Sequence, residues 1–261
     1  MTTKKSIIGV FGDSYADINP VQYIDEGLDR MPWPLWLQKI SGSEVVPHAL
    51  SATSTWYSYK KFLSSYKNYD RIVFCFSDLH RWHNINDDGI HYGLYHIRYQ
   101  DQLKHVHPDS LRDAKTLVDA YRLIHDWDLD KFLFQSIFDS VNNLCDEAGI
   151  KIINILNFEE INGTPLNIDI STTTNTVLTN LVQVSGSEYM DFPNKPKDEE
   201  IYKFITENAD KRFCHLSPHN NKVLAEIICE CFDNPQSYIN LGNDIRFSGD
   251  VENLRYLLDL K

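Results

Sequence analysis

Short apolar runs that alternate with helical patterns are the feature that most restricts how this chain can fold. Ile7–Phe11, Arg71–Phe76 and Lys151–Leu156 are mostly apolar, and Val45–Val46 belongs to a weaker run. Nearly uninterrupted apolar runs of this length are typical of strands that are covered on both faces, as in a parallel sheet. The runs therefore predict a buried parallel sheet.

Apolar residues at helical spacing separate these predicted strands. They indicate four helices, around residues 33–40, 56–66, 132–144 and 223–232. We expect Gly149 to end the third helix, and Ser217 with Pro218 to begin the fourth. Alternation of strands and helices predicts an α/β fold with helices on both faces of the sheet.

Two stretches interrupt the alternation. Residues 78–127 hold seven of the ten histidines, and residues 159–205 are rich in Asn, Thr, Ser and Pro. Long loops of this kind are usually functional or mobile. We expect one α/β domain over residues 1–234, with these stretches as insertions after the third and fourth strands. A C-terminal extension over residues 235–261 is expected to dock on the body.

The charge balance bears on the partners. Lys and Arg number 25 and Asp and Glu number 37, which gives a formal net charge of −12. The densest basic cluster, Lys60–Lys61 with Lys67 and Arg71, is diluted by tyrosines and acids. An acidic chain without a basic patch is poorly suited to phosphate backbones or anionic lipid. We therefore expect neither nucleic acid nor a membrane as a partner.

Cysteine usage and the N-terminus bear on metals and location. The five cysteines are odd in number and show no CxxC spacing, which argues against a disulfide framework or a zinc site. His80 and His83 form a weak pair without a clear third ligand, so no metal is expected. The apolar stretch at residues 7–11 is too short for a signal peptide. We therefore expect the protein to be synthesised in the cytoplasm. The sequence leaves open whether it forms a homo-oligomer.

Two short motifs carry the candidate chemistry. Gly12-Asp13-Ser14 comes directly after the first predicted strand, at the edge where parallel sheets bind ligands. A serine in a tight turn there is placed to act as a nucleophile whose attack generates an oxyanion. His215 stands just before the last core helix, where a base would be held firmly. Each motif alone also fits an ordinary turn or helix start.

Together the two motifs resemble those of the SGNH (GDSL-type) hydrolase family, and the resemblance covers the chain from about Ser6 to Phe232. It implies a flavodoxin-like three-layer α/β/α fold with a parallel sheet. It also implies a serine esterase mechanism, with Ser14 as nucleophile, His215 as base and no cofactor.

The family's second motif implies an oxyanion hole. It places a small residue after the second strand, whose N–H joins that of the nucleophile. Ala52 stands where the family usually has glycine, and an alanine keeps this N–H. Ser14 and Ala52 are therefore the expected donors. The helix expected from about Thr55 would direct its positive end at the same place.

The family's third motif has an asparagine donor after the third strand, and this chain departs from it. The matching stretch is Phe76–Trp82, which contains no asparagine. Ser77, His80 or Arg81 would have to donate instead. An ionised Asp78 would repel a developing oxyanion.

The fourth motif departs as well. The family's acid lies three residues before the histidine, and Arg212 occupies that position here. Asp210 lies five residues before His215 and is the acid we expect to orient it. The alternative is that a backbone carbonyl orients the imidazole, which would leave a Ser-His dyad.

The resemblance implies an ester substrate, and we expect the O-acetyl group of a carbohydrate or a small ester. The residues expected to contact the substrate are Asp13, Ser77, Asp78, His80 and Trp82. Trp82 and its neighbouring aromatics would stack on sugar rings, although packing onto the body is the commoner role of such side chains.

A second interpretation belongs to a different class. The wider pattern also resembles SGNH-type proteins encoded by bacteriophages, which are expected to act on or bind acylated glycans of the host surface. The missing asparagine and Arg212 would then mark a weakened site. In that case the chain is a binding or structural module, such as a component of a virion.

Overall fold

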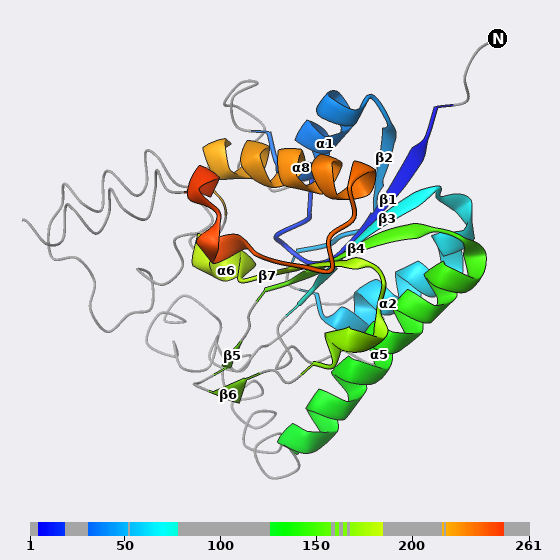
Figure 1. Ribbon diagram of the computed structural model, residues 1–261. Coiled ribbons are helices and arrows are strands. Elements are labelled where there is room, and N and C mark those ends of the chain that lie inside the picture. The colour runs from blue at the N-terminus through cyan, green and yellow to red at the C-terminus, as the bar shows by residue number, and fades with distance from the viewer. Residues whose placement is uncertain are drawn as a thin grey trace, which may run out of the picture.

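Parallel strands form the centre of the protein (Figure 1). The computed structural model describes residues 5–18, 31–51, 53–77, 126–157, 160–161, 164–165, 168–184, 216 and 218–247. Within these ranges the main sheet has six strands, which are in spatial order β2 (Glu44–Pro47), β1 (Ile7–Phe11), β3 (Arg71–Phe76), β4 (Lys151–Leu156), β7 (Thr176–Thr179) and β8 (Tyr238–Asn240). Each neighbouring pair is parallel, which confirms the predicted α/β class.

The order of the strands places a candidate site. From β2 to β7 it is the flavodoxin-like order, and β8 adds one further edge strand. The chain passes from β1 outward to β2 and then returns to the other side of β1 with β3. Ligands bind outside the carboxyl ends of the strands at such a reversal. The segments after β1 and β3 therefore flank the place where a site is expected.

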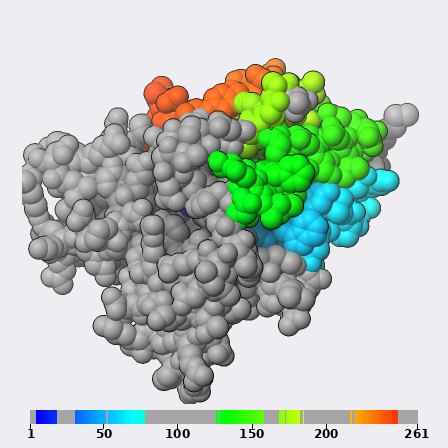
Figure 2. Space-filling view, turned by 90° about the horizontal axis from the view of Figure 1, so that it is seen from below, coloured from blue at the N-terminus to red at the C-terminus, as the bar shows by residue number. Residues whose placement is uncertain are grey.

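Helices cover both faces of the sheet (Figure 1). α1 (Trp33–Ser41) and α8 (Pro218–Asp233) pack on one face, in a core that includes Trp33, Leu37 and Leu224. α2 (Thr55–Ser65) and α5 (Trp127–Ala148) pack on the other, in a core rich in phenylalanine. Figure 2 shows α2 and α5 side by side, and Tyr59 Oη lies 2.7 Å from Ser140 Oγ between them.

Shorter elements complete the described part. They are η2 (Tyr66–Asn68), β5 (Glu160–Ile161), β6 (Thr164–Pro165), η4 (Ile170–Thr172), α6 (Leu181–Val184), η6 (Leu241–Asn243) and η7 (Ile245–Phe247). β5 and β6 form a separate antiparallel pair. No helix within the described ranges is long and apolar enough to cross a membrane.

The ends of two long helices follow from local sequence. Asp126 caps α5, because its carboxylate accepts from the N–H groups of Asp128 at 2.9 Å and Leu129 at 3.3 Å. Gly149 ends α5 with a φ of 69°, which glycine adopts without steric cost, so that prediction is confirmed. α8 begins at Pro218 as predicted, and Ser217 lies outside the described residues.

Two strands of the main sheet were not predicted from the sequence. β7 lies inside the stretch expected to be a loop with little core, yet all four of its residues are buried. β8 lies inside the expected C-terminal extension, and the described part of that extension, residues 235–247, therefore extends the sheet. The residues of the insertion expected at 78–127 are described only from 126 onward.

Candidate active site

The turn after β1 carries the predicted nucleophile at the carboxyl edge of the sheet. Asp13 is fully buried and Ser14 nearly so. Asp13 Oδ1 accepts from the Tyr15 N–H at 3.1 Å, and its carbonyl accepts from the Ala16 N–H at 3.0 Å. These contacts give Asp13 a structural task in the turn. Its contact with a substrate stays a prediction.

Gly12 lets this turn pack closely on the neighbouring strand. A Cβ at Gly12 would stand 2.8 Å from Cys75 Cβ and 3.0 Å from Ala16 Cβ, which is closer than side chains tolerate. The Gly12 carbonyl accepts from the Leu50 N–H at 3.2 Å and from Ser58 Oγ at 3.1 Å. The turn is therefore held from both the β2 loop and α2.

The first turn of α2 faces the site with hydroxyl groups. Ser54 caps the helix by accepting from the Tyr57 N–H at 3.2 Å. Thr55 Oγ1 donates to the Ser77 carbonyl at 3.2 Å. Trp56 and Leu63, which belong to the predicted apolar stripe, are each 44% exposed, because the helix turns Thr55 and Ser58 toward the sheet edge instead.

Ser77 follows β3 and was one of the side chains expected to replace the missing asparagine. It is buried, and its Oγ donates to the Thr53 carbonyl at 3.1 Å. A hydroxyl has one hydrogen, so this bond occupies the only hydrogen that Ser77 could offer to an oxyanion. The other expected residues of this region, Asp78, His80, Arg81 and Trp82, lie outside the described residues.

A buried carboxylate that the sequence analysis missed holds the loop before Ala52. Asp17 is 5% exposed, and its Oδ2 accepts from the Ser51 N–H at 3.0 Å and from Ser51 Oγ at 2.6 Å. Charge-assisted bonds of this kind are stronger than neutral ones. The position of Asp17, three residues after Ser14, was the only signal available in the sequence. Ala52 itself lies outside the described residues.

His215 and Asp210 also lie outside the described residues, but the neighbour of His215 does not. Leu216 is buried in the same core cluster as Tyr15, the neighbour of Ser14. Asn221 of α8 donates from Nδ2 to the Leu216 carbonyl at 3.0 Å, and its Oδ1 accepts from the Trp33 N–H at 2.8 Å. Trp33 Nε1 in turn donates to the Tyr15 carbonyl at 2.7 Å.

These three bonds join two distant parts of the chain. They run from Tyr15 through Trp33 and Asn221 to Leu216, and each of the four residues is buried. Buried polar bonds of this kind fix geometry, because breaking one leaves an unsatisfied group. The residues that follow Ser14 and His215 directly are thus parts of one packed unit.

Asn157 is a further polar residue at this edge that the sequence analysis missed. It follows β4 directly and is 4% exposed. Its Oδ1 accepts from the Cys75 thiol, with Sγ and Oδ1 3.6 Å apart. The only signal in the sequence was its place immediately after a strongly apolar strand.

Two other histidines are described, and neither is placed to serve Ser14. His48 follows β2, stacks on the Phe11 ring at a centroid distance of 4.9 Å and bonds the Tyr69 hydroxyl; both partners belong to the core of the α2 and α5 face. Burial lowers its pKa, and the charge of Lys61 adds to this. His219 is exposed and bonds the Arg246 carbonyl at 3.1 Å.

No cluster of three or more potential metal ligands occurs in the part of the chain that the structure describes. All seven histidines of the 78–127 insertion lie outside it. The arrangement of the described residues is that of a serine turn, a helix N-terminus and a tethered helix start at one sheet edge.

Comparisons with known proteins give structural likeness alone. No protein-family model and no curated protein matches the chain. It is similar to a structure described as a lipolytic protein of the G-D-S-L family from Desulfitobacterium hafniense DCB-2, with 14% identity, a TM-score of 0.42, and coverage of 86% of this chain and 98% of that one. It is also similar to a carbohydrate acetylesterase family member from Sinorhizobium meliloti, with 13% identity, a TM-score of 0.30, and coverage of 96% and 92%. Likeness at these TM-scores carries no argument for this chain.

Proposed function

We propose that this protein is a serine esterase of the SGNH type. One observation carries the proposal: the bonds from Tyr15 through Trp33 and Asn221 to Leu216 connect the sequence neighbours of Ser14 and His215. The reversal of strand order beside β1 supports it, because the Ser14 turn lies where parallel sheets bind ligands.

In the proposed reaction, Ser14 Oγ attacks the ester carbonyl carbon while His215 takes the serine proton. The N–H groups of Ser14 and Ala52 stabilise the oxyanion that forms. The intermediate expels the alcohol, which receives the proton from His215, and the acyl group stays on Ser14. Water then attacks the acyl-enzyme with His215 again as base and releases the acid. Asp210 orients His215.

The substrate class of the proposal is an O-acetylated carbohydrate or a small ester. The resemblance of the Gly12-Asp13-Ser14 and His215 motifs supports an acyl ester, and the aromatic residues around Trp82 support a sugar. Release of acetate from an acetylated oligosaccharide, measured against the deacetylated sugar as a blank, tests this part.

The activity itself is tested with p-nitrophenyl acetate. We expect Ser14→Ala to lower kcat by about 10³-fold or more, because the nucleophile is lost. Ser64→Ala is the matched control, since Ser64 is an exposed α2 serine whose Oγ donates to the Lys61 carbonyl at 2.7 Å. A fluorophosphonate probe should label the wild type and the control but not Ser14→Ala. Equal hydrolysis by the wild type and Ser14→Ala would contradict the proposal.

One observation favours a second function, the binding of an acylated glycan without turnover. The Ser77 hydroxyl donates to the Thr53 carbonyl, so Ser77 itself does not supply the donor that the family has after its third strand. A virion component encoded by a bacteriophage would use such a site for attachment. Glycan binding that survives Ser14→Ala, in a wild type that releases no acetate, would support this alternative.

A further inference from the structure

Asn157 and the nucleophile belong to the segments that follow β4 and β1, two strands apart at the same edge of the sheet. Phe11 of β1 pairs with Phe74 of β3, which pairs with Asn154 of β4. Ser77 and Asn157 follow their strands directly, and Ser14 lies in the turn three residues after the end of β1. Strands in a sheet are roughly 4.8 Å apart, so alternate strands are separated by roughly 10 Å. A small group bound over the middle strand would lie between these two segments.

The Asn157 amide leans toward β3, the strand between it and Ser14. Its Oδ1 accepts from the thiol of Cys75, and Cys75 Cβ lies 2.8 Å from the position that a Gly12 Cβ would take. Cys75 therefore contacts both the Ser14 turn and the Asn157 amide. This contact fixes the oxygen of the amide and leaves its NH₂ group for another partner.

The NH₂ group of Asn157 is an unused donor. Among the described residues it makes no hydrogen bond, and the side chain as a whole is 4% exposed. Nδ2 is not one of the fully buried polar atoms without a partner, so it stays open to a bound group. Ser77, the candidate that directly follows β3, donates its hydroxyl hydrogen to the Thr53 carbonyl.

We propose that Asn157 Nδ2 is the third donor of the oxyanion hole, supplied from β4 rather than from the segment after β3. This inference rests on the proposed esterase function. The Asn157 NH₂ joins the Ser14 N–H in binding the oxyanion, and the bond from the Cys75 thiol to Oδ1 orients the amide so that Nδ2 remains for this role. No proton is transferred by Asn157, which acts by hydrogen bonding alone.

The test compares p-nitrophenyl acetate hydrolysis by the wild type, Asn157→Ala and Asn157→Asp. Both substitutions remove the donor, so kcat should fall by about 10²–10³-fold while KM changes little, because an oxyanion donor acts in the transition state. Asn157→Asp keeps the size of the side chain and an acceptor for Cys75, and it guards against a loss that merely reflects misfolding. Asn234→Asp, at the exposed end of α8, is the control for adding a carboxylate and should retain wild-type kcat.

The outcomes separate this inference from the esterase function. Loss of kcat in both Asn157 variants, with a thermal unfolding midpoint near that of the wild type for Asn157→Asp, supports the donor role. Wild-type kcat in either folded variant, together with inactive Ser14→Ala, overturns the inference and leaves the esterase standing. A wild type without Ser14-dependent hydrolysis overturns both.

Discussion

Gly12 and His48 show how single residues shape the edge of the sheet. Gly12 is required by its close contact with Cys75 rather than by the chemistry, and it brings Ser14 to the carboxyl end of β1. His48 lies next to the same strand but packs into the opposite core, where it stacks on Phe11 and bonds the Tyr69 hydroxyl. His48 follows the strand next to β1, but it is not placed to act as a base for Ser14 because its ring contacts Phe11 and Tyr69 instead.

His48 should make stability depend on pH. Burial, and then the charge of Lys61, lowers its pKa below the usual 6.5, so the unfolded chain binds this proton more readily than the folded protein. Its contribution is present above pH 6.5 and is lost as the pH falls below 6.5 toward the folded pKa. We expect wild type to lose more stability than His48→Gln between about pH 7.5 and about pH 5.5, measured by urea unfolding. His219→Gln, at an exposed site, should behave like the wild type; identical pH profiles for wild type and His48→Gln would contradict the prediction.

At the level of elements, α1 and α8 are joined on one face of the sheet by Asn221. Its side chain connects the first N–H of α1 to the Leu216 carbonyl just before α8. The two helices carry no catalytic group of their own in the proposal. Their task is to hold the segments that follow Ser14 and His215 in one packed unit.

Asn221→Ala should therefore impair both stability and turnover. It leaves the Trp33 N–H and the Leu216 carbonyl unsatisfied, at a cost of about 2 kcal/mol in the free energy of unfolding. We also expect kcat for p-nitrophenyl acetate to fall by at least about tenfold, since displacement of a catalytic group by about 1 Å is costly. Asn221→Asp keeps the acceptor for Trp33 but loses the donor to Leu216, so it separates the two bonds. Wild-type kcat in Asn221→Asp would show that the Leu216 bond has no part in positioning.

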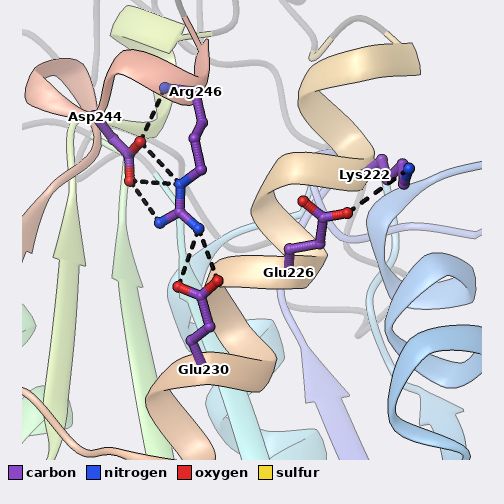
Figure 3. A network of polar contacts seen from close by, with 5 residues as sticks. All are labelled: Lys222, Glu226, Glu230, Asp244 and Arg246. Atoms are coloured by element: carbon purple, nitrogen blue, oxygen red, sulfur yellow. Dashed lines mark hydrogen bonds and ion pairs between the residues drawn. The ribbon is translucent and has the colours of Figure 1, made fainter.

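At the level of the whole molecule, the C-terminal part of the described chain closes the sheet edge and is tied back to α8. Figure 3 shows Arg246 of η7 between two carboxylates. Its guanidinium bonds Asp244 at 2.7 to 3.1 Å and Glu230 of α8 at 2.8 and 3.0 Å. The hydrogen bonds from Arg246 lower the pKa of Asp244, which shows that the ionised pair is favoured.

Arg246→Ala should loosen this closure. We expect a loss of about 1 kcal/mol in the free energy of unfolding, because bidentate pairs in a network exceed a single exposed pair. The matched control is Lys222→Ala, which removes the exposed Lys222–Glu226 pair of 3.7 Å that Figure 3 also shows and should cost at most about 0.5 kcal/mol. A salt concentration of about 1 M should reduce the difference in the free energy of unfolding between wild type and Arg246→Ala, because salt screens the charges. A difference that salt leaves unchanged would assign the effect to packing instead.

Much of the fold was predictable because a strand that is buried on both faces is recognisable in the sequence as an almost continuous apolar run. The runs that became β1, β3 and β4 are apolar from one end almost to the other, and Pro218 and Gly149 mark helix ends by their own backbone preferences. β7 and β8 were missed for the opposite reason. Thr176–Thr179 and Tyr238–Asn240 are short and partly polar. They become strands because β4 offers an edge to β7, and β7 in turn offers an edge to β8.

By itself, the amino-acid sequence determined the strand–helix alternation and the place of Ser14 after the first strand, because both depend on neighbours a few residues away. Tertiary structure alone decided which polar groups meet at the sheet edge. The Ser51 loop is held by Asp17, the Ser77 hydroxyl donates to the Thr53 carbonyl, and the Cys75 thiol donates to Asn157. Each of these pairings joins residues far apart in the chain, whose meeting depends on strand order and register and leaves no local pattern.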